Sequence, residues 1–283
     1  KLKIPRVKGE TAEDEDELLS AVEELGYPVL IRPSYVIGGL NMVVLRDSDE
    51  LKRVVDEGNI QYPILVDEYL EATEAELDLA SDGEHVLIPA IIEHIEKTGV
   101  HSGDSFCIIP AQSFQNETKQ QMAVYAKKIV KELKYKGLMN IQFIVKGNEV
   151  YLLEVNPRSS RTMPIVSKAA GVDLVKKATK ILLGKYILSK DEVLLDSDAR
   201  YTVVKHPVFS NFALKGLDAR TGPQMISTGE GISIASTLEE ALHKSFRSIS
   251  GKAVQGDIAF ADENDLLEAG DFSADFHFIH IDK

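Results

Sequence analysis

Residues 138–155 carry the pattern that most limits how this chain can fold. Apolar and polar residues alternate on both sides of a Gly-Asn-Glu segment at 147–149. Such alternation around a turn signal predicts two antiparallel strands joined by a tight loop. A three-residue loop makes every pair on one face apolar, whereas a two-residue loop would mix the faces, so the pattern favours three residues. The expected pairs are Ile141 with Val155, Phe143 with Leu153, Val145 with Tyr151, Gln142 with Glu154, and Asn140 with Asn156.

The polar face of this hairpin gathers amide and carboxylate oxygens on one rigid ribbon. Hard oxygen donors with one or two carboxylates are the ligands that Mg²⁺ prefers, with phosphate oxygens and water completing its shell. Arg158 and Arg161 follow directly and match phosphate or carboxylate oxygens in shape and charge. Two interpretations stay open from the residues alone: a divalent-metal site, or the solvated outer face of a hairpin.

A second candidate is the segment from Arg32 to Gly39, between two expected strands. Its Gly38-Gly39 pair would let the backbone approach a ligand closely, and successive N–H groups can hold phosphate. Arg32 ends a buried strand, where a charge needs an anionic partner. The alternative is an ordinary turn beside a surface arginine.

A third candidate is the polar run from Glu93 to Ser105, which contains two histidines, three acids and two serines. A zinc site from His94, His101 and Asp104 is one interpretation, although the spacing fits no standard ligand pattern. A serine triad is another, without a nucleophile-elbow sequence. A hydrogen-bonded turn with surface histidines is the structural alternative.

Length and charge limit the class of protein. The 283 residues predict one large domain or two modest ones, and 44% hydrophobic content suffices for a core. A net charge of −13 argues against nucleic-acid binding. The single cysteine, Cys107, excludes an internal disulfide and indicates a reducing, intracellular compartment. No apolar run approaches a membrane span. The chain opens at Lys1, so we expect it to be cut from something longer.

Hydrophobic periodicity and turn residues predict the other elements. Ser48 is the expected N-cap of the second helix. The expected helices cover 13–25, 48–55, 117–133 and 238–246, with one or two more across 160–183. The expected strands cover 28–33, 42–45 and 63–70, with extended segments near 76–80 and 85–96, irregular order after 189, and an alternating end at 272–281.

Five segments occur together in an order that resembles the ATP-grasp fold of the carbamoyl phosphate synthetase large subunit. Their residues are similar to those of its C-terminal half, which phosphorylates carbamate. The resemblance covers roughly residues 1–250. The family usually has Arg after the glycine pair, where this chain has Leu40. The segments are 32–39, 65–70, 93–105, 137–143 and 154–162.

The resemblance implies an α+β fold: an ATP-grasp unit of two α+β subdomains with antiparallel sheets, truncated at the N-terminus and extended at the C-terminus. The implied parts are a small (lid) subdomain over 1–70, a large subdomain over 71–187, a following segment over 188–250, and a truncated or divergent start of a regulatory domain over 251–283.

The resemblance also implies roles for individual residues. For ATP, these are Arg32, Gly38 and Gly39 at the phosphates, Glu68 and Leu70 at the adenine, and Glu74 at the ribose. For the divalent metals, they are Gln142, Glu154 and Asn156. For carbamate or the transferring phosphoryl group, they are Arg158 and Arg161, with His101 nearby. For a monovalent cation, usually K⁺, they are Glu74, His94 and Ser105. For an ornithine activator in some members, they are Glu96, Asp104 and Glu230.

The implied activity is ATP-dependent phosphorylation of carbamate to carbamoyl phosphate, within glutamine- or ammonia-dependent synthesis for the arginine and pyrimidine pathways. The implied cofactors are ATP, Mg²⁺ or Mn²⁺, and K⁺. The implied partners are a glutaminase small subunit and the other half of the large subunit, in the cytoplasm. Two alternatives remain: another ATP-grasp carboxylate–amine ligase, such as a biotin carboxylase relative, or a non-catalytic nucleotide-binding or docking fragment.

Overall fold

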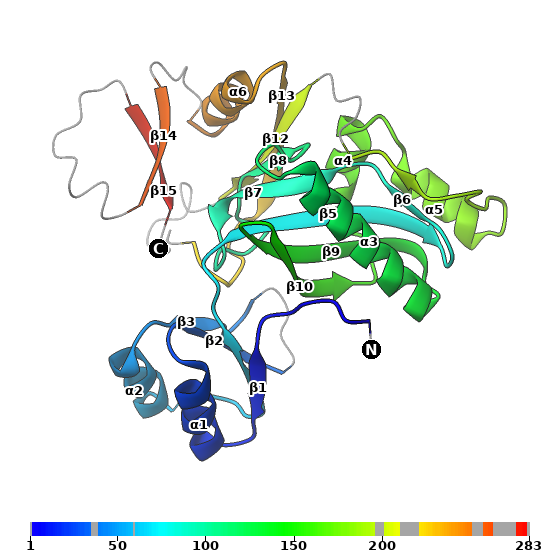
Figure 1. Ribbon diagram of the computed structural model, residues 1–283. Helices are drawn as coiled ribbons and strands as arrows, with labels where there is room; N and C mark the ends of the chain where they lie inside the picture. Colours follow the sequence, from blue (N-terminus) through cyan, green and yellow to red (C-terminus); the bar gives the residue numbers. More distant parts are fainter. Residues whose placement is uncertain are drawn as a thin grey trace.

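The computed structural model describes residues 2–34, 39–58, 60–195, 201–209 and 221–250, and the strands 257–262 and 276–281. Two separate sheets carry most of this part of the chain, each covered by helices (Figure 1). Nearly all neighbouring strands within these two sheets run antiparallel, which confirms the predicted α+β class.

The smaller sheet is built from the first part of the chain and lies below the larger one in Figure 1. Helices α1 and α2 pack on one face of it, through Leu18 and Leu51 against Ile31 and its neighbours. Asp47, rather than the predicted Ser48, caps α2, because its carboxylate accepts from the N–H groups of the first turn. The elements are β1 (Gly9–Ala12), α1 (Glu15–Leu25), β2 (Val29–Pro33), β3 (Val43–Leu45), α2 (Ser48–Asp56) and β4 (Ile64–Glu68), in the sheet order β1-β4-β2-β3.

The larger sheet follows the order β10-β9-β5-β7-β8-β12-β13, and off this path β6 pairs with β5 and β11 pairs with β6. Its strands are β5 (Thr73–Asp82), β6 (Val86–Ile88), β7 (Ile91–Lys97), β8 (Cys107–Ile109), β9 (Lys136–Lys146), β10 (Glu149–Asn156), β11 (Glu192–Val193), β12 (Thr202–Val208) and β13 (Gly229–Ala235). Its helices are α3 (Asn116–Leu133), α4 (Met163–Ala169), α5 (Leu174–Leu182) and α6 (Leu238–Ser250).

The two faces of the larger sheet have different roles. Helix α3 covers one face, where Leu77 and Phe143 are fully buried against it. Helices α4 and α5 cover part of the other face (Figure 1). Because side chains alternate along a strand, the acids of β5 at 74, 76 and 78 point away from α3. They therefore share the second face with the polar residues of the neighbouring strands.

The hairpin of β9 and β10 differs from the predicted one near its loop. Its loop has two residues, because Glu149 pairs with Lys146 and Leu152 pairs with Phe143. The predicted pairs of 143 with 153 and of 145 with 151 are therefore wrong. A β-bulge at Leu153 adds one residue and restores the predicted register beyond it. The pairs that carry the polar face are confirmed: Gln142 with Glu154, Asn140 with Asn156, and Ile141 with Val155.

The region after residue 189 contains more regular structure than we predicted. Strands β12 and β13 join the larger sheet through β8, so the expectation of irregular order there is wrong. Of the last segment, β14 (Asp257–Asp262) and β15 (Phe276–Ile281) form a separate parallel pair. The division into parts at 70, 187 and 250 stays a prediction. In the described part of the chain, no helix has the length and apolar character needed to cross a membrane.

Candidate functional site

A cleft of about 620 Å³ opens between the two sheets, and both contribute to its walls. One wall is the face of the smaller sheet that α1 and α2 do not cover. The other wall is the polar end of the larger sheet. The structure thus brings together predicted residues that are up to 126 positions apart in the chain. Those that line the cleft are Arg32, Gly39, Glu68, Leu70, Glu74, His101, Gln142, Glu154, Asn156 and Arg158. Gly38 lies outside the described residues.

The hairpin presents its predicted oxygen donors to this cleft. Glu154 is exposed there, whereas Asn156 is buried. The amide of Gln142 donates to Ser102 Oγ at 3.4 Å, and Arg158 donates to Asn156 Oδ1 at 3.1 Å. One carboxylate and two amides fit a divalent ion that takes its remaining oxygens from phosphates and water, as Mg²⁺ does.

The geometry contradicts both the zinc interpretation and the serine-triad interpretation. Within the described ranges, no three His, Cys, Asp or Glu side chains are grouped so that they could hold a metal. Asp104 instead accepts the N–H groups of Ile226 and Ser227, at 2.8 and 2.9 Å. His101 Nδ1 accepts from the Gly103 N–H at 3.0 Å, and Ser105 Oγ donates to the His101 carbonyl. Burial lowers the pKa of His101, and Arg161 adds to that effect against the opposing charge of Asp104.

Arg32 has the anionic partner that its position requires. Its Nε donates to Asp67 Oδ2 at 2.7 Å, across the adjacent strands β2 and β4. The side chain remains 35% exposed at the cleft. Asp67 therefore orients the guanidinium group without removing it from the cleft.

Gly39 makes a close approach that no other residue type would allow. Its φ is 71°, and a Cβ at this position would clash with the Pro223 carbonyl oxygen. Pro223 follows Gly222, whose carbonyl accepts from the His101 N–H at 2.8 Å. Gly39 of the smaller sheet's part of the chain thus rests on a segment that is hydrogen-bonded to His101, in the part that forms the larger sheet.

We expect Gly39→Ala to destabilise the protein by about 1–3 kcal/mol, because it adds both left-handed strain and a clash with Pro223. Gly26→Ala is the matched control, since Gly26 has a φ of 74° but nothing within 4 Å of its added Cβ. Urea unfolding of both variants, followed by circular dichroism, separates strain from contact. Equal losses of stability would contradict a close packing of Gly39 on Pro223.

A row of buried polar side chains continues inward from the cleft. His94 Nε2 lies 2.8 Å from Glu76 Oε1, and His94 Nδ1 lies 3.6 Å from Glu74 Oε2. Asn140 Nδ2 donates to Glu76 Oε2 and to Asp78 Oδ1, both at 3.0 Å. All five side chains are at least nine-tenths buried.

Burial and hydrogen bonding push the pKa values of these acids apart. Burial raises the pKa of Glu74 to about 7, against the opposing charge of His94. Burial also raises the pKa of Asp78 to about 6, with Glu76 adding to it. Burial alone would raise the pKa of Glu76, but the hydrogen bond and charge of His94 outweigh it and lower the value to about 2. Of the three acids in the row, Glu76 therefore keeps its negative charge to the lowest pH.

A buried lysine lies beside the residues implied for an effector. Lys205 is fully buried, and its Nζ donates to the Ser102 carbonyl at 2.8 Å. Glu230 Oε1 lies 3.9 Å from Lys205 Nζ and 3.2 Å from Arg161 Nε. Burial raises the pKa of Glu96 to about 7, against the opposing charges of His94 and Lys205. Arg161 is not among the residues that line the cleft, so its predicted contact with substrate stays a prediction.

Several residues of this site have no role predicted from the sequence. Glu76 and Asp78 had a signal, because acids at 74, 76 and 78 alternate along an apolar strand. Asp67 and Lys205 had none, since only the pairing of strands places them beside Arg32 and Glu230.

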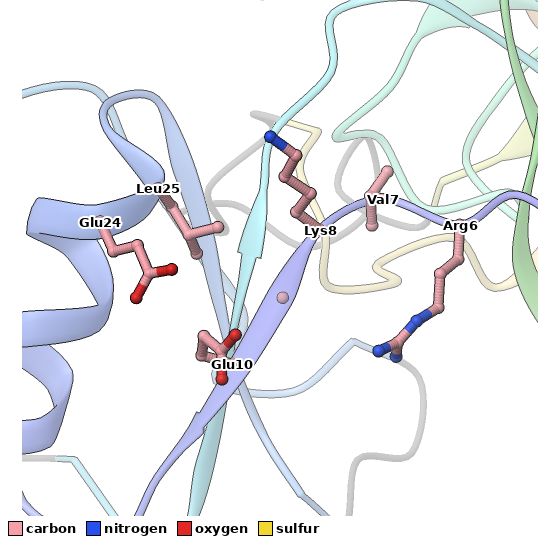
Figure 2. A pocket seen from close by; sticks show the side chains of 7 residues that line it. Arg6, Val7, Lys8, Glu10, Glu24 and Leu25 are labelled. Atoms are coloured by element: carbon pink, nitrogen blue, oxygen red, sulfur yellow. The ribbon is translucent and has the colours of Figure 1, made fainter.

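A second, smaller hollow of about 340 Å³ lies between β1 and the end of α1. Figure 2 shows Glu10 and Glu24 on the helix side of the strand and Arg6 on the other side of it. None of the predicted site residues lines this hollow, so the larger cleft is the candidate site.

Comparisons with known proteins agree with the geometry. Relatives include the carbamoyl phosphate synthase arginine-specific large chains of Geobacillus stearothermophilus, 50% identical over 251 residues, and of Bacillus subtilis, 44% identical over 249 residues. The matches cover 87% and 88% of this chain and 24% of each relative. The chain thus spans about a quarter of the length of these relatives.

Solved structures confirm the predicted ATP-grasp fold. An ADP complex of N5-carboxyaminoimidazole ribonucleotide synthetase is similar with a TM-score of 0.70 and 17% identity, over 90% of this chain and 69% of that one. The biotin carboxylase domain of the Hydrogenobacter thermophilus 2-oxoglutarate carboxylase has a TM-score of 0.71 and 19% identity, over 89% and 63%. At such identities the likeness concerns the fold alone.

The family model described as "Carbamoyl-phosphate synthase L chain, ATP binding domain" matches residues 1–190, well over half of the sequence. This chain belongs to that family.

Proposed function

We propose that this chain transfers the γ-phosphoryl group of ATP to carbamate and so forms carbamoyl phosphate. The observation that carries the proposal is the 50% identity to an arginine-specific carbamoyl phosphate synthase large chain over 251 residues, which include every oxygen donor of the cleft's polar wall. The products would serve the arginine and pyrimidine pathways.

The nucleotide would lie between the two sheets. Arg32, oriented by Asp67, and the loop at Gly39 would contact its phosphates from the smaller sheet. Glu68, the last residue of β4, and Leu70, on the segment that joins the sheets, would meet the adenine, and Glu74 would meet the ribose hydroxyls. Gln142, Glu154 and Asn156 would hold Mg²⁺ or Mn²⁺, which neutralises phosphate charge when bound.

Catalysis in this arrangement is positioning and charge neutralisation, with no covalent intermediate on the protein. The carbamate oxygen attacks the γ-phosphorus, and ADP leaves with the bonding electron pair. Arg158, at the cleft, would hold the anionic substrate. Arg161 lies against Gly103, two residues after His101, and these two side chains would lie near the same substrate. A guanidinium group suits this role because it stays charged and presents paired donors.

We also propose the finer assignments that the family implies. A monovalent cation such as K⁺ would bind near Glu74, His94 and Ser105. An effector would bind near Glu96, Asp104 and Glu230, where Lys205 already supplies a buried positive charge. The partners would be a glutaminase small subunit and the other half of the large subunit, in the cytoplasm.

Formation of ATP from ADP and carbamoyl phosphate by the complete protein tests the proposal. We expect ATP to form only when Mg²⁺ or Mn²⁺ is present. Carbamate is the product of the reverse step, so its release should match ATP formation one to one. Failure to form ATP under any metal or potassium concentration would contradict the proposal.

A second candidate is a nucleotide-binding module without catalysis, and Leu40 is the observation that favours it. Leu40, directly after Gly39, is 52% exposed at the position where the resemblance implies an arginine. Calorimetry with Mg-ATP separates the two candidates, because binding without any ATP formation would favour the module. The remaining alternative, another carboxylate–amine ligase, has only the shared fold in its support.

A further inference from the structure

Asp78 lies where three parts of the site meet, although it does not line the cleft. It is fully buried on β5, with an exposed fraction of 0%. Its Oδ1 accepts from Ser160 Oγ at 2.7 Å and from Asn140 Nδ2 at 3.0 Å, and its Oδ2 accepts from Thr162 Oγ1 at 2.7 Å. A buried carboxylate is costly unless donors surround it, and these three side chains supply them.

Two of these donors belong to the loop that carries the arginines. We call residues 157–162 the arginine loop, since it contains Arg158 and Arg161. Ser160 and Thr162 flank Arg161, and Ser160 Oγ also accepts the N–H of Met163 at the start of α4. Asp78 therefore ties the end of the arginine loop to the middle of the larger sheet.

The third donor begins a chain of amides that leads back to the cleft. Glu76 and Asp78 both accept from Asn140 Nδ2, so a reversed Asn140 amide would place its oxygen against two carboxylates. Asn140 Oδ1 therefore accepts from Asn156 Nδ2, at 3.5 Å. Arg158, which can only donate, contacts Asn156 Oδ1 at 3.1 Å. Both contacts leave Asn156 with its oxygen toward Arg158 and the cleft.

We propose that Asp78 is a positioning residue that fixes both the arginine loop and, through Asn140, the orientation of the Asn156 amide. It touches neither nucleotide nor substrate in the proposed arrangement. This inference rests on the proposed function for its catalytic consequence, whereas the placement of the loop is independent of it.

The first test replaces Asp78 with Ala in the complete protein, with Ser81→Ala as the matched control. Ser81 is a fully buried polar residue of the same strand, and its Oγ donates to the His85 carbonyl, away from the cleft. Mn²⁺ binding is measured by electron paramagnetic resonance with a non-hydrolysable ATP analogue. We expect the dissociation constant of Mn²⁺ to rise about ten-fold in Asp78→Ala, and to stay at the wild-type value in Ser81→Ala.

Hydrogen exchange gives a readout that does not need turnover. Peptides covering 157–163 should exchange faster in Asp78→Ala than in the wild type or in Ser81→Ala. In ATP formation, the KM for carbamoyl phosphate should rise about ten-fold while the KM for ADP stays within about two-fold. In Asp78→Asn, the exchange rate and the KM for carbamoyl phosphate should stay close to the wild-type values. Asn retains one oxygen as an acceptor, and the hydroxyl groups of Ser160 and Thr162 can accept from its NH₂ group instead of donating.

Unchanged Mn²⁺ binding and unchanged exchange in a folded Asp78→Ala variant would overturn the inference. If that variant does not fold, Thr162→Val removes one donor and keeps the charge, and we expect shifts in the same direction but smaller. Wild-type values in Thr162→Val would then overturn it. A wild-type protein that makes no ATP would refute the proposed function, while the exchange experiment still tests the placement of the loop by Asp78.

Discussion

Glu154→Ala is expected to abolish metal-dependent phosphoryl transfer while leaving the fold intact. Glu154 is the only carboxylate among the three hairpin side chains proposed to hold the metal, and it is exposed to the cleft rather than packed in the core. Losing it removes the one full negative charge that balances the cation, while two neutral amides remain. We expect ATP formation from ADP and carbamoyl phosphate to fall by about 10³-fold or more.

The same variant should cost little stability, within about 0.5 kcal/mol of the wild type in urea unfolding, because an exposed side chain is truncated. Glu149→Ala is the matched control: Glu149 is an exposed acid at the start of the same strand, and its Oε2 accepts from Tyr151 outside the cleft. It should leave turnover at the wild-type rate. Normal turnover in Glu154→Ala would mean that the metal is held elsewhere.

The polar face of the hairpin could be predicted from sequence because local alternation determines it. Asn140, Gln142, Glu154 and Asn156 lie on one face in the structure as predicted. The prediction survived an error in the loop, because the bulge at Leu153 compensates for the shorter turn before the strand reaches Glu154. A bulge has no periodic signal, so the alternation alone could not distinguish a three-residue loop from a two-residue loop followed by a bulge.

Contacts between distant strands could not be predicted in the same way. Strand β12 was not predicted, because its apolar pattern is interrupted by Lys205, His206 and Pro207. The surroundings of Lys205 explain its place in the strand: it is fully buried, and its Nζ donates to the Ser102 carbonyl. Because lysine is almost never fully buried without a partner, a lysine in the sequence is expected at the surface until its partners are known.

The partner of Arg32 shows the same limit. The sequence indicated that a charge at the end of a buried strand needs an anion, and a phosphate group was the predicted partner. The structure gives it Asp67 as well, from a strand 35 positions away. Only the pairing of β2 with β4 makes that contact, so the need for a partner was predictable and its identity was not.

Glu76→Gln is expected to destabilise the protein by about 3–5 kcal/mol. The substitution keeps the size of the side chain and one oxygen for Asn140, but it removes the negative charge 2.8 Å from His94 Nε2. Burial would lower the pKa of His94, and the contacts of Cys107 and Glu76 raise it well above its usual value. Without Glu76, the carboxylate left beside the buried imidazolium would be the more distant Glu74.

The pH dependence of this loss distinguishes a charge effect from simple misfit. The pKa of Glu76 falls from 4.5 to about 2 on folding, so its charge contributes stability above pH 4.5 and loses that contribution as the pH falls through 2. The part of the difference between wild type and Glu76→Gln that comes from the Glu76 charge should therefore be fully present above about pH 4.5 and shrink as the pH falls further. Glu71→Gln, at an exposed position near the same strand, should change stability by less than about 0.5 kcal/mol at each pH. A loss in Glu76→Gln that persists unchanged into acid would show that shape, rather than the charge shared with His94, makes Glu76 necessary to the row of buried side chains behind the cleft.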